Sequence, residues 1–403
     1  MTAAPVPISR LRAVTRIIDD APGDLAGDLV DDLAPDGFAW LDDGIGFVTA
    51  GVAARVDPHE ATDLLAGIDH DGDLEIPGTG PVAVGALPFD PTRSGALVVP
   101  QRVVGRLPDG RRWITQLGPS AHDAPRASAR PKRFTVDVRT SYAEWCGMVQ
   151  RALDVIGRGE LEKVVLARRV DVTADQPFDV RDVVTHLRVD QPGCFVYAAE
   201  GLVGATPELL LRRRGDRVES RPMAGTAIGT DDDARARLDD SDKDAREHRP
   251  VPLAIADALA PWCTTLEVPD APRVVRLASV SHLVTPVVGR LTPSAPDAWS
   301  LAAALHPTPA VGGSPRGLAL RTIAALEPDD RGRYAGPVGW VDARGDGDWG
   351  VALRGAVIDE THATLHAGAG IVTGSDPDAE WRETEAKLDP MLRALRVRDG
   401  RSS

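Results

Sequence analysis

Along much of the chain, short segments with a regular pattern of apolar and polar residues are separated by turns that contain Gly or Pro. Before residue 118, residues 46–53 and 96–104 have strand character and residues 58–68 have helical spacing. Further on, segments rich in Val, Leu or Ile predict strands at residues 163–172, 194–199, 209–214, 336–342, 349–358 and 363–367. These strands cluster instead of alternating with helices, which predicts an α+β fold rather than a doubly wound parallel sheet.

Helical spacing is clearest after residue 140. A helix is predicted over residues 141–158, and Gly159 is placed to end it. In the predicted C-terminal helix, Glu380, Glu383 and Lys387 fall on one stripe that borders an apolar stripe. Further helices are predicted at residues 251–260, 299–305, 316–326 and 378–396.

Residues 118–133 combine Pro, Ala, Ser and basic side chains without either hydrophobic period, so they read as a surface connection. We therefore expect a strand-rich N-terminal portion over residues 1–130, which shows no recognisable chemistry. Residues 135–396 contain the candidate chemistry, and residues 397–403 form a polar tail.

Composition narrows the class of protein. The formal net charge is -14, and no basic cluster is long enough to reverse that sign, which argues against a nucleic-acid partner. Three distant cysteines allow neither a disulfide framework nor a CxxC metal site. The sequence offers neither a signal peptide nor an apolar stretch of about 18 residues, so we expect a cytoplasmic protein without a membrane partner.

Two charged residues stand at the ends of apolar strands. Lys163 begins one predicted strand, where its amine either reaches solvent or is desolvated with a lowered pKa and acts as a base. Glu208 precedes another, where burial would raise its pKa and make it a general acid, the alternative being an ordinary carboxylate at a strand edge.

Glutamates on two distant helices form a candidate magnesium site. Glu247 lies in one charged helical segment, and Glu380 and Glu383 lie in the C-terminal helix. Carboxylate oxygens are ligands that Mg²⁺ prefers, although each segment alone also reads as an ordinary charged helix. Pro250 and Pro252 follow Glu247 closely, so we expect that helix to start late or to kink.

Glycines and an arginine suggest an anion site. Gly225, next to Thr226, and the pair Gly368 and Gly370 could let backbone N–H groups approach an anion, or could simply form turns. Arg354, predicted inside the strand over residues 349–358, could hold a carboxylate with two hydrogen bonds or form an ion pair within the sheet.

A glycine pattern at residues 345–350 matches GxGxxG, but a phosphate cradle requires a strand before it and a helix after it. Because a strand follows here instead, we expect a hairpin turn and disfavour a nucleotide-binding protein.

Taken together, these segments resemble the chorismate-utilising enzymes, and within them the isochorismate synthases. The resemblance covers about residues 140–396. It rests on nine blocks that occur in the family's order: Lys163–Arg168, Thr206–Leu211, Pro222–Thr226, Ser241–His248, His282–Pro286, His306–Ala310, Gly339–Trp340, Ala367–Ile371 and Glu380–Thr384.

The resemblance implies two antiparallel sheets packed face to face, with helices outside, and a monomer that converts chorismate into isochorismate. It assigns Lys163 as the base that activates water for attack at ring carbon C2, and Glu208 as the acid that protonates the departing C4 hydroxyl. Mg²⁺ would be held by Glu247, Glu380 and Glu383. The substrate would be bound by Gly225, Thr226, His282, Ala310, Arg354, Gly368, Gly370 and Lys387.

Related activities remain open at this point. Salicylate synthases share the lysine base and also eliminate pyruvate, a step against which the small apolar Ala310 weighs slightly. Synthases of the anthranilate type use ammonia, usually with a glutaminase partner, and normally lack a lysine at the position of Lys163. No glutaminase partner is therefore expected. The product could serve menaquinone or siderophore synthesis.

Overall fold

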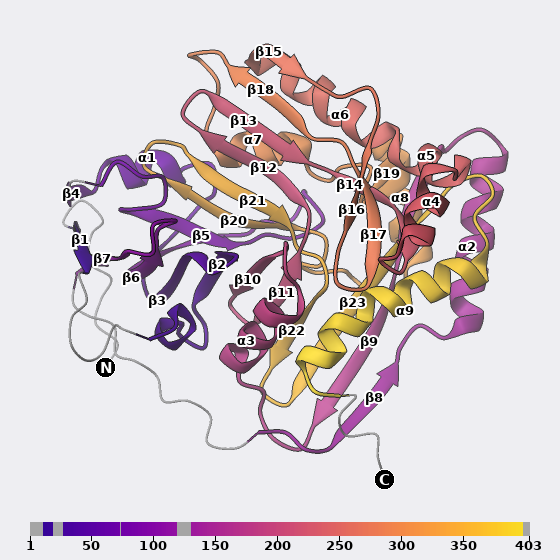
Figure 1. Cartoon of the computed structure of the whole chain (residues 1–403), viewed down its shortest axis with the longest axis horizontal. Coiled ribbons are helices and arrows are strands. Elements are labelled where there is room, and N and C mark those ends of the chain that lie inside the picture. The colour runs from indigo at the N-terminus through magenta and orange to yellow at the C-terminus, as the bar shows by residue number, and fades with distance from the viewer. Residues whose placement is uncertain (1–10, 19–26, 73, 119–129, 398–403) are drawn as a thin grey trace.

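The computed structural model describes residues 11–18, 27–72, 74–118 and 130–397, and it has the predicted α+β architecture (Figure 1). The strands are β1 Arg12–Ile18, β2 Phe38–Asp42, β3 Ile45–Val56, β4 Asp69–Asp71, β5 Val82–Ala86, β6 Leu97–Arg106, β7 Arg112–Leu117, β8 Phe134–Val138, β9 Lys163–Ala174, β10 Phe195–Ala199, β11 Leu202–Thr206, β12 Leu209–Arg214, β13 Arg217–Arg221, β14 Met223–Ile228, β15 Cys263–Glu267, β16 Arg273–Arg276, β17 Val280–Val284, β18 Val287–Leu291, β19 Gly313–Ser314, β20 Pro337–Asp342, β21 Gly347–Val351, β22 Gly355–Asp359 and β23 His362–Ile371.

Helices cover the outside of the sheets. They are α1 Ala61–Ala66, α2 Tyr142–Gly157, α3 Val180–Asp190, α4 Asp232–Asp239, α5 Asp242–His248, α6 Pro250–Leu259, α7 Ala298–Leu305, α8 Arg316–Leu326 and α9 Pro377–Ala394, with short 3-10 turns at Leu29–Asp32 and Ala260–Trp262. Among the described helices, none is both long and apolar enough to span a bilayer.

The strands form two long antiparallel runs that share β6. One run follows the order β7, β6, β3, β2, β10, β11, β22, β23, β9 and β8, and the other follows β6, β5, β20, β21, β12, β13, β18 and β15. A separate three-stranded sheet contains β14, β17 and β16. The N-terminal strands therefore belong to the same sheets as the rest, since β2 pairs with β10 and β5 pairs with β20.

An aromatic core lies where the two runs face each other. Trp40 of β2 stacks on Phe195 of β10 with ring centroids 5.0 Å apart, and Phe47 of β3 meets Trp340 of β20 edge-on at 5.7 Å. Buried Leu209 of β12 belongs to the same cluster. Burial of such large apolar surfaces is the main stabilising contribution to packing two sheets together.

The prediction of one continuous strand over residues 349–358 is wrong in the middle of that segment. Residues 349–358 form two strands, β21 and β22, which are separated by Ala352, Leu353 and Arg354. Arg354 has a positive φ of 49°, which cannot continue a strand, and the Leu353 carbonyl accepts a hydrogen bond from the Tyr197 hydroxyl. Arg354 therefore lies in a break of the sheet, not in a strand ion pair.

The other strands and helices that the sequence predicted lie at their expected positions, with their ends shifted. Strand β23 extends to Ile371 because it pairs with β9 along its whole length, and the N-terminal helix is shorter than expected. Most of the predicted connection at residues 118–133 falls outside the described residues, as does the tail beyond Val397. Val397 itself is buried, so this end of the chain is not entirely a polar tail.

Helix α9, drawn in yellow in Figure 1, packs against β23 and α2. The Trp145 indole of α2 donates a hydrogen bond to the Pro377 carbonyl at the start of α9. Arg168 of β9 places its guanidinium 3.8 Å from the Trp381 ring centre and donates to the Thr384 hydroxyl. These contacts fix the side of α9 that carries Glu380, Glu383 and Lys387.

A buried ion pair joins two other parts of the interior. Arg331 is bonded to Glu327, and its guanidinium also donates to the carbonyls of Val311 and Val165 at 2.9 and 2.7 Å. Glu327 in turn accepts the backbone N–H of Ala167 at 2.8 Å. The pair therefore links β9 to the segment that precedes β19. Both buried charges also have further hydrogen-bond partners in the backbone, which offsets the cost of burying them.

Replacing Arg331 by Met should lower the free energy of unfolding by about 3–5 kcal/mol, because it leaves the Glu327 carboxylate buried without its partner. The exposed pair of Arg93 with Asp330 supplies a control, and Arg93→Met should change stability by less than about 1 kcal/mol. Chemical denaturation measures both values, and equal losses in the two variants would contradict the structural role of Arg331.

Candidate active site

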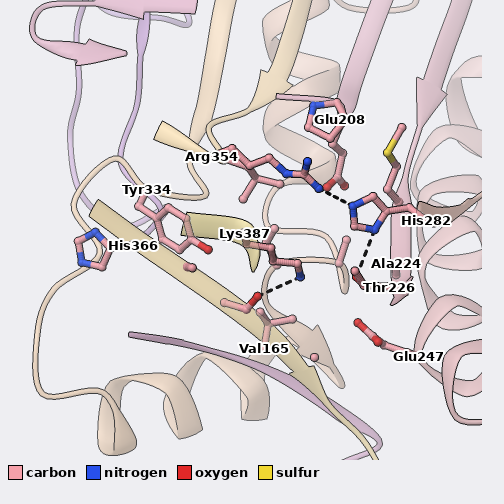
Figure 2. A pocket seen from close by; sticks show the side chains of 18 residues that line it. Val165, Glu208, Ala224, Thr226, Glu247, His282, Tyr334, Arg354, His366 and Lys387 are labelled. Atoms are coloured by element: carbon pink, nitrogen blue, oxygen red, sulfur yellow. Dashed lines mark hydrogen bonds between the residues drawn. The ribbon is translucent and has the colours of Figure 1, made fainter. Parts of the chain in front are cut away.

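A pocket of about 640 Å³, including its open mouth, lies between the strands β9, β14, β17 and β23 and the helices α5 and α9 (Figure 2). Arg354, Lys387 and Tyr334 project into it from different elements. Its lining consists of Val165, Pro207, Glu208, Met223, Ala224, Thr226, Glu247, His282, Ala310, Val311, Tyr334, Leu353, Arg354, His366, Ala367, Gly368, Gly370 and Lys387.

Lys163 lies fully buried behind this lining, so its amine does not reach solvent. Its Nζ donates to the Glu247 carbonyl at 3.0 Å and lies 3.4 Å from the Glu247 carboxylate. Burial lowers the pKa of Lys163, and the attraction of Glu247 opposes this only in part. An amine in this position is available as a base closer to neutral pH than an exposed lysine.

Glu208 sits between β11 and β12 and is also fully buried. Burial raises its pKa to about 8, against the opposing effects of Lys163 and Lys387. The carboxyl is therefore mostly protonated at neutral pH and can donate a proton, which it loses as the pH rises through about 8. Lys163, behind the pocket lining, and Glu208, in it, thus have pKa values shifted in opposite directions.

His282 supports Arg354 at one wall of the pocket. The Arg354 guanidinium donates to His282 Nε2 at 2.5 Å, so the other ring nitrogen carries the proton and donates to the Gly225 carbonyl. Burial, and then Arg354, lower the pKa of His282 well below its usual value. The second terminal nitrogen of Arg354 is buried without a hydrogen-bond partner among the described residues, which suits an incoming carboxylate.

Lys387 occupies the middle of the pocket in Figure 2. Its Nζ donates to the Gly368 carbonyl at 3.1 Å and to the Glu383 carboxylate, one turn earlier in α9, at 2.6 Å. Gly368 keeps the backbone close to its neighbours, because a Cβ there would lie a tight 3.1 Å from both the Leu166 carbonyl and the Tyr334 hydroxyl.

Helix α5 is held against β14 by His248. Its Nδ1–H donates to the Ala224 carbonyl at 3.1 Å, and its Nε2 accepts from the Thr285 hydroxyl at 2.8 Å. The helix spans Asp242–His248 and α6 begins at Pro250, so the helix that holds Glu247 does not start late but ends just after it, before the first proline. This attachment directs Glu247 into the cavity.

The three candidate magnesium ligands each face a lysine. Glu247 faces Lys163, Glu380 lies 2.7 Å from the ammonium of Lys243, and Glu383 bonds to Lys387. In the described part of the chain, no three His, Cys, Asp or Glu side chains converge closely enough to form a complete metal site.

The chemistry of the three glutamates nevertheless fits a hard cation. They offer oxygen atoms alone, and Glu247 Oε2 is buried without a hydrogen-bond partner in the described structure. Burial, and then the nearby Glu383 carboxylate, raise the pKa of Glu380 to about 7, which shows that the carboxylates repel one another. At Gly370, a Cβ would lie 2.2 Å from Glu247 Oε1, so a side chain there would displace this carboxylate.

The structure brings the residues predicted from sequence into one region. Nine of them line the pocket: Glu208, Thr226, Glu247, His282, Ala310, Arg354, Gly368, Gly370 and Lys387. Of the other four, Lys163, Gly225 and Glu383 each contact a lining residue, whereas Glu380 contacts Lys243.

Sequence reasoning missed three residues near this site. Tyr334 and His366 line the pocket, and their rings stack 5.2 Å apart. Tyr334 could have been suspected as one of just three tyrosines, and because it lies between two glycines. Lys243 lies in a block that was recognised, but its pairing with Glu380 depends on the tertiary structure.

The GxGxxG match at residues 345–350 forms the turn and first strand residues of a hairpin between β20 and β21, as predicted. It contributes no residue to the pocket.

Comparisons with known proteins agree with this geometry. A family model described as "Chorismate binding enzyme" matches residues 100–396. Isochorismate synthase DhbC of Bacillus subtilis is 38% identical over 334 residues, which cover 79% of this chain and 81% of that protein. Isochorismate synthase EntC of Escherichia coli is 35% identical over 382 residues, which cover 89% and 95%.

The solved structure of MenF, the menaquinone-specific isochorismate synthase of Escherichia coli, superposes with a TM-score of 0.78. It is 27% identical, and the match covers 96% of this chain and 94% of that one. The chain therefore belongs to the chorismate-binding enzymes, and it is similar in sequence and in structure to their isochorismate synthases.

Proposed function

We propose that this enzyme converts chorismate into isochorismate. The observation that carries the proposal is the pair of buried residues Lys163 and Glu208, whose pKa values are shifted toward the neutral amine and the neutral acid. A neutral base and a neutral acid at the same pH are what this isomerisation requires. The similarity to isochorismate synthases supports the same activity.

In the proposed reaction, Lys163 accepts a proton from water while the water oxygen forms a bond to ring carbon C2. The ring double bonds shift, and the C4–O bond breaks. Glu208 donates its proton to the departing C4 hydroxyl, which leaves as water. One water enters and one leaves, so the net reaction is an isomerisation, and the two residues exchange protonation states before the next cycle.

The substrate carries two carboxylates, and the pocket offers positive groups for them. Arg354 has an unpartnered N–H group at the wall, and Lys387 lies in the middle of the cavity. The Tyr334 hydroxyl, which accepts the Gly368 N–H, could donate to a carboxylate. These local charges oppose the acidic character of the whole chain and favour binding of a dianion.

We assign Mg²⁺ as the cofactor, held by Glu247, Glu380 and Glu383. A bound Mg²⁺ would neutralise a substrate carboxylate and withdraw electron density from the ring. The glutamates would hold the cation beside the cavity, since Glu247 lines it and Glu383 is bonded to the lining residue Lys387.

Two related activities are less consistent with the site. The ammonia-using synthases need no base for water, whereas Lys163 is present and buried. Salicylate synthesis also requires pyruvate elimination. Ala310, which lines the pocket without a hydroxyl group, favours release of isochorismate.

Purified enzyme incubated with chorismate and Mg²⁺ should accumulate isochorismate reversibly, with little pyruvate. Chromatography of the ring compounds and a coupled dehydrogenase assay for pyruvate measure both. Stoichiometric pyruvate with fluorescent salicylate would overturn the assignment, and anthranilate formed with added ammonium would move the enzyme to the other branch.

Lys163→Met and Glu208→Gln should each lower kcat by at least about 10²-fold, the usual range for a positioned proton transfer, while the fold is retained. In the wild-type enzyme, kcat should fall as the pH rises through about 8, because Glu208 then loses its proton. Steady-state kinetics and circular dichroism test these expectations. Near-normal turnover in either variant would remove that residue from the mechanism.

Chelation should abolish activity reversibly without unfolding the protein, because the three glutamates keep lysine partners when the metal is removed and the apolar core does not depend on it. Gly370→Ala should lower both Mg²⁺ affinity and kcat at least about tenfold, since a methyl group there displaces Glu247. Gly157→Ala, where a Cβ has no atom within 4 Å, is the matched control. Full activity in excess chelator would exclude the metal assignment.

A further inference from the structure

Lysine is scarce in this protein, and its distribution is uneven. Just four of the 46 Lys and Arg side chains are lysines: Lys132, Lys163, Lys243 and Lys387. Lys132 is exposed, whereas the other three each face one of the glutamates Glu247, Glu380 and Glu383. Arginine therefore supplies nearly all of the positive side chains of this protein, whereas the compact ammonium groups of lysine face the three carboxylates of the site.

Lys243 differs from Lys387 because it does not line the pocket, and it differs from Lys163 because its side chain is partly exposed. Its ammonium lies 2.7 Å from Glu380, whose side chain is 1% exposed, while the lysine side chain itself is 26% exposed. Lys243 lies one turn before Glu247 in α5, and Glu247, Glu380 and Glu383 all attract it. All three carboxylates therefore attract the ammonium group of Lys243, which does not form part of the pocket wall.

We infer that Lys243 is a built-in competitor of the divalent cation, which holds Glu380 in the metal-free enzyme and must release it when the cation binds. The inference rests on the proposed metal site, and it assigns to Lys243 a role that differs from those of Lys163 and Lys387.

The chemistry of the two cations explains why such an exchange is possible. An ammonium ion has one charge and three donor hydrogens, whereas Mg²⁺ has two charges and accepts six oxygen atoms, so it binds a cluster of carboxylates more strongly. The flexible stem of Lys243 is partly exposed, so its ammonium can move into solvent while α5 stays in place. An arginine, whose planar guanidinium forms two parallel hydrogen bonds to a carboxylate, would be harder to displace.

The competition has a thermodynamic consequence. Without both the metal and Lys243, Glu380 would lie buried near Glu247 and Glu383 without an ion-pair partner, and their repulsion would destabilise the contact between α5 and α9. Lys243 prevents this, but the metal then binds just the fraction of molecules in which Glu380 is free. If that fraction is about one tenth, the apparent affinity for Mg²⁺ is about tenfold weaker than the intrinsic affinity.

Titration calorimetry of the full-length protein with MgCl₂ tests this inference. Lys243→Met and Lys243→Gln should bind Mg²⁺ about tenfold more tightly than the wild type. Metal-free Lys243→Met should also melt at a lower temperature than the metal-free wild type. Lys243→Arg, which keeps the charge, should bind at or below the wild-type affinity.

The matched control is Arg246→Gln, which removes a positive charge from an exposed position of the same helix. Its affinity should change less than about twofold, because solvent screens this charge. Tighter binding in Lys243→Met and Lys243→Gln, but not in Arg246→Gln, supports the inference.

Unchanged or weaker binding in Lys243→Met and Lys243→Gln, or equal tightening in Arg246→Gln, would overturn the competitor while leaving the metal site in place. Failure of both the wild type and the Lys243 variants to bind Mg²⁺ would overturn the metal assignment together with the competitor. The two failures are therefore distinguishable.

Discussion

The site depends on keeping three lysines and three glutamates together at the edge of one cavity. Each of these charges has lost much of its hydration, and removing one partner of a buried pair typically costs about 3–5 kcal/mol. The elements that carry them are accordingly tied down by other contacts: His248 fixes α5 to β14, and Arg168 fixes α9 to β9. The antiparallel sheets bring these distant segments together, so the fold and the electrostatics of the site cannot be separated.

The same desolvation prepares the proposed chemistry. In water, a lysine is charged and a glutamate is ionised at neutral pH, which is the wrong combination for a base and an acid. Burial lowers the pKa of Lys163 and raises the pKa of Glu208, and the opposite charges around them limit how far each pKa moves. Arg354 and Lys387 supply positive charge for the substrate without ionising Glu208, whose pKa stays at about 8.

Much of this arrangement could be predicted from the sequence, because strand ends and glycine turns leave local signals. Lys163 at the start of an apolar run and Glu208 before another were singled out as candidates in this way, but only the resemblance to a family chose between a catalytic and an ordinary structural role. Arg354 was misplaced because its apolar neighbours read as a continuous strand, whereas its positive φ is imposed by tertiary contacts. The partner of Lys243 lies 137 positions away in sequence, and no local pattern could reveal it.

The central claim is that Lys163 activates water for attack at C2 while Glu208 assists departure of the C4 hydroxyl. Running the reaction in ¹⁸O-labelled water tests this directly, with the product examined by mass spectrometry at early conversion, before the reverse reaction scrambles the label. The account predicts one ¹⁸O atom per isochorismate, located in the C2 hydroxyl, and none newly introduced elsewhere. Isochorismate without label at C2 would mean that the hydroxyl moves within the substrate, and it would contradict the proposed roles of both residues.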